Sequence, residues 1–112
     1  MAEPYYSQLR QILESLHIPK ATLECKHFFS GAALYANGNI CASLGPAGFA
    51  VKLPEEKRLD LIREEKGSEF RYFASGPVKR DYVLLKESVI QDDQAFQEIF
   101  SQSVEFVLGP MV

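Results

Sequence analysis

The feature that most constrains this chain is the Asn37-Gly38 dipeptide, which lies between two apolar runs of strand length. Both residues readily take a positive φ, as the tightest β-hairpin turns require. A second turn signal, Gly45-Pro46-Ala47-Gly48, follows at a distance of one further strand. Because strands joined by such short turns pair antiparallel, this stretch predicts the centre of an antiparallel sheet.

The two turns also set a register, and the register assigns side chains to the two faces of the sheet. The first turn pairs Tyr35 with Ile40 and Leu34 with Cys41, and side chains then alternate along each strand. The face expected to form the core carries Ala33, Tyr35, Ile40, Ala42, Leu44, Phe49, Val51 and Leu53. The opposite face, expected to be open or lightly covered, carries Leu34, Cys41, Ser43, Ala50 and Lys52.

Three segments predict helices. Apolar side chains recur at helical spacing over residues 3–17, and Pro19 follows as a stop signal. Pro54 suits a first helical position, and the charged helix that it begins should end near Gly67. Asp92 or Asp93 caps a last helix that should run to Gly109-Pro110.

Further strands are expected at 22–29, 70–73 and 82–86, the last two joined by a loop over 74–81. The order of elements is then α-β4-α-β2-α. It predicts one α+β domain over residues 1–112, with two layers and a mainly antiparallel sheet of five or six strands. Helices lie at both termini, and one lies between strands.

Composition narrows the class of protein. The chain has 112 residues and a formal net charge of −3, whereas proteins that bind nucleic acid through phosphate contacts are usually basic. No apolar run approaches the roughly 18 residues of a membrane span, and the N-terminus lacks the pattern of a signal peptide. Two cysteines fit a compartment in which thiols stay reduced. We therefore expect a cytoplasmic protein without a membrane segment.

Cys25, His27 and Cys41, with His17, are the residues from which a metal or nucleophilic site would have to be built. They lack the closely spaced ligand pairs of structural zinc sites. The predicted register also places Cys41 on the face opposite Cys25, which argues against a shared metal and against a disulfide. We expect no catalytic residues, no metal and no cofactor. The alternative is a small ligand-binding protein or enzyme that uses Cys25 and His27.

One exposed basic spot is expected in the loop Val78-Lys79-Arg80, close to the aromatic side chains of Tyr72 and Tyr82. Two positive charges could contact an acidic partner or a few phosphates. A weak nucleic-acid contact through residues 78–80 is therefore a second alternative, although direct binding of nucleic acid is not the expected function. A solvated hairpin loop is the plainer interpretation.

Taken in order, these elements resemble the N-terminal domain of the TfoX/Sxy competence regulators. The resemblance covers nearly the whole chain and lies in the succession of elements, with Ser30 standing where the family usually has a glycine. The matching residues are Phe29-Ser30-Gly31, Leu34-Tyr35 with Asn37-Gly38, Phe49 to Leu53, the helix from Pro54, Phe70, Val78-Lys79 before Tyr82-Val83, and the closing helix with Phe106 and Pro110.

The resemblance implies a secretion-chaperone-like α+β fold that is often dimeric. In the full-length regulators it implies a role in switching on DNA-uptake genes with the cyclic-AMP receptor protein. We therefore predict a single-domain, non-enzymatic interaction domain that modulates transcription through a protein partner or through self-association as a homodimer. The residues expected to contact that partner are Leu34, Cys41, Ser43, Lys52, Lys79 and Arg80.

Overall fold

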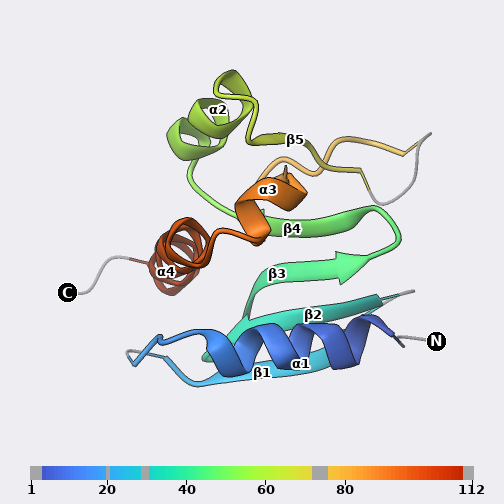
Figure 1. The fold of residues 1–112 in the computed structure, drawn as a ribbon, viewed down its shortest axis with the longest axis vertical. Helices are drawn as coiled ribbons and strands as arrows, with labels where there is room; N and C mark the ends of the chain where they lie inside the picture. The colour runs from blue at the N-terminus through green and yellow to red at the C-terminus, as the bar shows by residue number, and fades with distance from the viewer. Residues whose placement is uncertain (1–3, 20, 29–30, 72–75, 110–112) are drawn as a thin grey trace.

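The sheet that the turns predict is present and has six strands (Figure 1). A computed structural model describes residues 4–19, 21–28, 31–71 and 76–109. Within these residues the strand order is β1-β2-β3-β4-β6-β5, and every neighbouring pair is antiparallel. The strands are β1 (Leu23–Phe28), β2 (Gly31–Ala36), β3 (Asn39–Gly45), β4 (Gly48–Lys52), β5 (Gly67–Glu69) and β6 (Tyr82–Leu85).

Four helices accompany the sheet: α1 (Tyr5–Ser15), α2 (Glu55–Arg63), α3 (Glu87–Ile90) and α4 (Asp93–Leu108). The predicted α+β fold with helices at both ends of the chain is confirmed. The Asp92 carboxylate accepts a hydrogen bond from the Ala95 amide at 3.1 Å, which is the expected N-cap of the last helix. No helix in the described part of the chain is long and apolar enough to cross a membrane.

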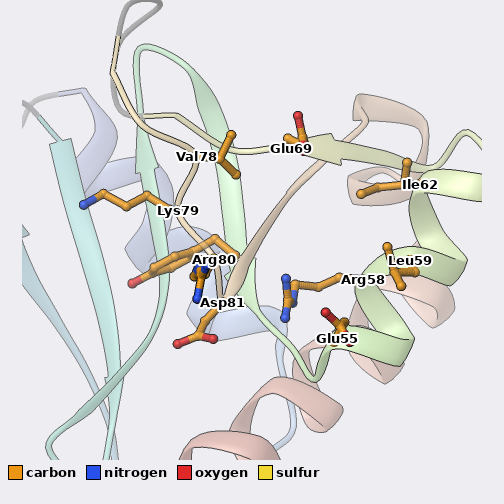
Figure 2. A pocket seen from close by; sticks show the side chains of 10 residues that line it. Glu55, Arg58, Leu59, Ile62, Glu69, Val78, Lys79, Arg80 and Asp81 are labelled. Carbon is orange, nitrogen blue, oxygen red and sulfur yellow. The ribbon is translucent and has the colours of Figure 1, made fainter.

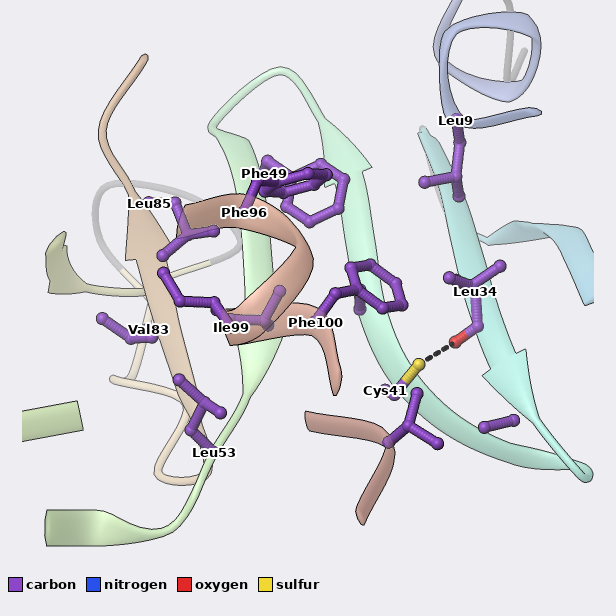
Figure 3. Close-up of a cluster of buried hydrophobic side chains, with 14 of the residues drawn as sticks. Leu9, Leu34, Cys41, Phe49, Leu53, Val83, Leu85, Phe96, Ile99 and Phe100 are labelled. Carbon is purple, nitrogen blue, oxygen red and sulfur yellow. Dashed lines mark hydrogen bonds between the residues drawn. The ribbon is translucent and has the colours of Figure 1, made fainter. Parts of the chain in front are cut away.

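The helices α1 and α4 pack on one face of the sheet and enclose the main core (Figures 1 and 3). Leu9 of α1 is fully buried there. Phe49 of β4 contacts two rings of α4, with centroid distances of 5.2 Å to Phe96 and 6.3 Å to Phe100. Burial of large aromatic side chains contributes strongly to a core of this size, so these contacts fix α4 across the centre of the sheet.

A β-bulge in β3 changes the predicted register. Asn37 and Gly38 have φ angles of 50° and 85°, so the turn is as predicted, and Tyr35 pairs with Ile40. Beyond that pair the register shifts, because Leu34 pairs with Ala42 and leaves Cys41 as an extra residue. One extra residue in a strand reverses the alternation of every side chain beyond it.

The face assignment is therefore correct on one side of the bulge and wrong on the other. Ala42, Leu44, Phe49, Val51 and Leu53 belong to the helix-covered core, as predicted. By contrast, Leu34 and Cys41 were expected on the open face, and both are fully buried in the same core. Conversely, three residues that were expected in the core lie on the opposite face. Ala33 and Tyr35 alternate with Leu34 and Ala36 along β2, and Ile40 is paired with Tyr35.

The second half of the chain differs from prediction in its boundaries. A strand was expected at 70–73, but β5 is Gly67–Glu69, and α2 ends at Arg63 rather than near Gly67. Phe70 is buried outside the strand, against the Tyr82 ring at 5.6 Å, so its apolar character reflects packing on the second face of the sheet. Residues 72–73 lie outside the described residues, and the single turn of α3 was not predicted.

Candidate functional site

The helix α2 differs from the other long helices because none of its nine residues, all of which the structure describes, is buried. Its side chains are mostly charged. Leu59 and Ile62 are nevertheless apolar and remain 53% and 37% exposed. Residues three apart lie on the same side of a helix, so these two side chains form one apolar strip on the surface.

That strip forms one wall of an open groove with a volume of about 470 Å³ (Figure 2). The opposite wall is the segment from Val78 to Tyr82, which leads into β6, and Glu69 at the end of β5 also lines the groove. The apolar lining comes from Leu59, Ile62, Val78 and Tyr82. The charged lining comes from Glu55, Arg58, Glu69, Lys79, Arg80 and Asp81.

Hydrogen bonds to backbone carbonyl groups hold the two walls of the groove in place. The Arg58 side chain reaches from α2 and donates from Nε to the Leu53 carbonyl oxygen at 2.9 Å. The Leu53 amide in turn donates to the Asp81 carbonyl oxygen at 3.0 Å. On the other wall, the Lys79 amide donates to the Phe70 carbonyl oxygen at 2.8 Å. The groove is therefore built on the ordered backbone that connects β4, α2 and β6.

The charges around the groove are of both signs, with three carboxylates and three cationic side chains among the lining residues. A site that binds phosphates or nucleic acid gathers positive charge with few acids. Here Asp81 directly follows Arg80, and both are exposed. An apolar strip edged by mixed charges is instead typical of protein interfaces, which combine apolar centres with polar rims.

The structure places the residues that were expected to contact a partner in four different positions. Leu34 and Cys41 are in the core, so neither can contact a partner in this fold. Ser43 lies on the second face of the sheet but is only 6% exposed. Lys79 and Arg80 line the groove. Lys52 lies beside the groove, because its Nζ is 5.6 Å from the centroid of the Tyr82 ring.

Sequence reasoning missed Leu59 and Ile62 as exposed residues, because apolar residues in a helix are normally assigned to the core. A signal was present in the composition of the helix. Leu59, Leu61 and Ile62 are the only apolar residues in α2, whereas a helix that packs on a core usually shows a broad apolar stripe. A strongly charged helix with so few apolar residues is better explained as a helix exposed on the protein surface.

Cys25 and His27 lie on the same side of β1, as predicted, but the surroundings of each do not favour a nucleophilic pair. His27 is exposed and stacks on Tyr6, with ring centroids 4.6 Å apart and planes 5° apart. Burial raises the pKa of the Cys25 thiol, and the nearby Arg10 only partly opposes this. A raised pKa keeps the thiol protonated and poorly nucleophilic.

The second cysteine is still less reactive, because burial raises the pKa of the Cys41 thiol to about 12. Its Sγ donates to the Leu34 carbonyl oxygen at 3.5 Å (Figure 3). Among the described residues, no three His, Cys, Asp or Glu side chains come together as a metal site. The groove beside α2 is consequently the strongest candidate for a functional site in the described part of the chain.

Comparison with known proteins places the chain by family. Residues 16–107 match the family described as the TfoX N-terminal domain. No curated protein matches the chain. The family match indicates a regulatory domain of a non-catalytic family, and it covers every strand of the sheet together with α2, α3 and nearly all of α4.

Proposed function

Because the chain belongs to the TfoX N-terminal domain family, we propose that it is a non-enzymatic regulatory domain that binds a protein partner in the groove beside α2. The process that it regulates through this partner is transcription, as the resemblance to the competence regulators implies. The groove supplies the binding surface, and the chain contributes no chemical step of its own.

The single observation that carries this proposal is the exposed apolar strip of Leu59 and Ile62. A nine-residue helix is too short to be stable by itself in water. It is held here by its contacts with β5 and by the bond from Arg58 to the Leu53 carbonyl oxygen, while its apolar strip faces the groove. Contact with a partner would remove that apolar surface from water and so favour association.

The groove also indicates the chemistry of the partner. One or two apolar side chains of the partner would occupy the strip between Leu59 and Val78. Acidic groups beside them would face Lys79 and Arg80, and basic groups would face Glu55 and Glu69. A short amphipathic segment with both charge signs satisfies these requirements, and such segments commonly dock in apolar grooves.

The test is affinity capture from native cell extract with three forms of the tagged chain, quantified by mass spectrometry. Leu59→Asp combined with Ile62→Asp places charges in the apolar strip. We expect this variant to lose at least one protein that the wild type enriches, by about tenfold or more, since central apolar contacts often contribute over 1 kcal/mol each.

The matched control is Glu56→Lys combined with Lys57→Glu, which changes two exposed residues of α2 that do not line the groove. This control should retain the same captured protein. Because all four side chains are exposed, both variants should keep the thermal midpoint of the wild type. Equal capture by the wild type and the groove variant would contradict the proposal.

A further inference from the structure

We propose that two copies of this chain pair antiparallel through their β1 strands, about a two-fold axis that passes beside Cys25. The two sheets would then form one continuous sheet. This interface uses the edge of the sheet opposite to α2 and the groove, so it neither requires nor excludes the partner proposed above. The observations that lead to it are an open strand edge and a self-complementary pattern of charge.

The strand β1 is a free edge in the described part of the chain, where it pairs with β2 alone. The Asn37 amide donates to the Thr22 carbonyl oxygen at 2.9 Å, so Thr22 directs its backbone groups toward β2. Backbone direction alternates along a strand. The amide and carbonyl groups of Leu23, Cys25 and His27 therefore point outward, where they can pair with a second strand.

The side chains next to Cys25 make this edge complementary to itself. An axis beside Cys25 places Glu24 of one copy opposite Lys26 of the second copy, and Lys26 opposite Glu24. Both residues are exposed. These positions are the non-hydrogen-bonded pairs of the new ladder, in which opposed Cα atoms are closest, at about 4.5 Å. Opposite charges directly across such a pair stabilise it.

The same charges select one register. An axis beside Glu24 would place two Glu24 carboxylates against each other, and an axis beside Lys26 would do the same with two ammonium groups. Like charges directly opposite each other destabilise a strand pair. Within the described residues, Glu24 forms no ion pair. The Lys26 Nζ lies 4.8 Å from the Tyr35 ring centroid. Glu24 and Lys26 therefore lie on the same face of the sheet, opposite the helices.

The helix-covered side of this edge is also preorganised. The His27 ring stacks on the Tyr6 ring of α1. The Arg10 guanidinium carbon lies 6.0 Å from the centroid of the Tyr6 ring. In the proposed register, His27 faces Leu23 of the second copy, and Leu23 is only partly buried within one chain. Contact between these side chains would add apolar burial above the new strand pair.

The test is charge reversal followed by mixing, with mass measured by sedimentation equilibrium. Glu24→Lys alone and Lys26→Glu alone each create two like-charged pairs, and we expect each to weaken self-association by about tenfold or more. An equimolar mixture of these two variants restores every opposite-charge pair, so a heterodimer should form with wild-type affinity. The double variant carrying both changes should form a homodimer for the same reason.

Cys25 reports the register directly. At alkaline pH, which ionises part of the Cys25 thiol, a short bismaleimide should link two wild-type chains through Cys25, and Cys25→Ser should remove the linked species. The Glu56→Lys/Lys57→Glu variant serves as the control and should associate and cross-link like the wild type. Wild-type chain that remains monomeric at about 1 mM, or a dimer that the single charge reversals leave unchanged, would overturn the proposal. Loss of the groove partner alone leaves these results unaffected, so the two proposals fail separately.

Discussion

At the scale of single residues, Ser103 ties α4 to the bulge in β3. Its hydroxyl donates to the Cys41 carbonyl oxygen at 3.0 Å, and both residues are fully buried. A bulge interrupts the regular ladder of backbone hydrogen bonds, so the carbonyl of the extra residue needs a partner from elsewhere. Ser103 supplies that partner from a position 62 residues away in sequence.

We predict that Ser103→Ala lowers the free energy of unfolding by about 1–3 kcal/mol, because it leaves the buried Cys41 carbonyl without a donor. Urea denaturation monitored by circular dichroism measures this change. The control is Ser88→Ala on α3, where the side chain is exposed, and it should change stability by less than about 0.5 kcal/mol. Equal effects of the two substitutions would show that the hydroxyl does not support the bulge.

At the scale of elements, Gly31 allows β2 and β3 to approach closely. A Cβ atom at this position would lie 2.2 Å from the Leu44 carbonyl oxygen and 2.9 Å from the Gly45 Cα. Both are backbone atoms, which cannot rotate away as the end of a side chain can. Gly31 is one of the residues that carry the family resemblance. Steric crowding by the backbone of β3 explains why a glycine is needed at this position.

We predict that Gly31→Ala destabilises the chain by about 1–3 kcal/mol or more, the usual cost of overpacking. Gly45→Ala is the matched control in the adjacent strand, because its added Cβ would meet only the Gly31 Cα at 3.9 Å. Thermal unfolding of the two variants makes the comparison. A Gly31→Ala protein as stable as Gly45→Ala would rule out the close approach of β2 and β3.

At the scale of elements, the difference between local contacts and contacts between distant segments explains which features could be predicted from sequence. Turns and caps depend on residues adjacent in the chain. The Asn37-Gly38 turn is therefore as predicted, and of the two predicted cap residues, Asp92 and Asp93, Asp92 is the N-cap. The bulge in β3 depends on how β2 and β3 pack beneath the helices, which no local pattern records. The exposure of Leu59 and Ile62 depends likewise on where α2 lies relative to the sheet. These contacts between distant segments account for most of the errors in the predicted site.

At the scale of the whole molecule, the two proposed surfaces lie at opposite ends of the sheet. The edge strand β1 is at one end, and β5, against which α2 packs, is at the other (Figure 1). Pairing through β1 would therefore leave both grooves of a dimer open. A dimer would then offer two equivalent sites to partners, which strengthens binding to any partner that is itself dimeric.

The central claim is that the groove beside α2 contacts a protein, and site-specific photocrosslinking in native cells tests it most directly. A photoreactive amino acid replaces Leu59 in one form of the chain and the exposed Gln94 of α4 in a control form. We predict that position 59 yields a defined covalent adduct with another protein and that position 94 does not. The absence of an adduct at position 59, or the same adduct at both positions, would contradict the claim.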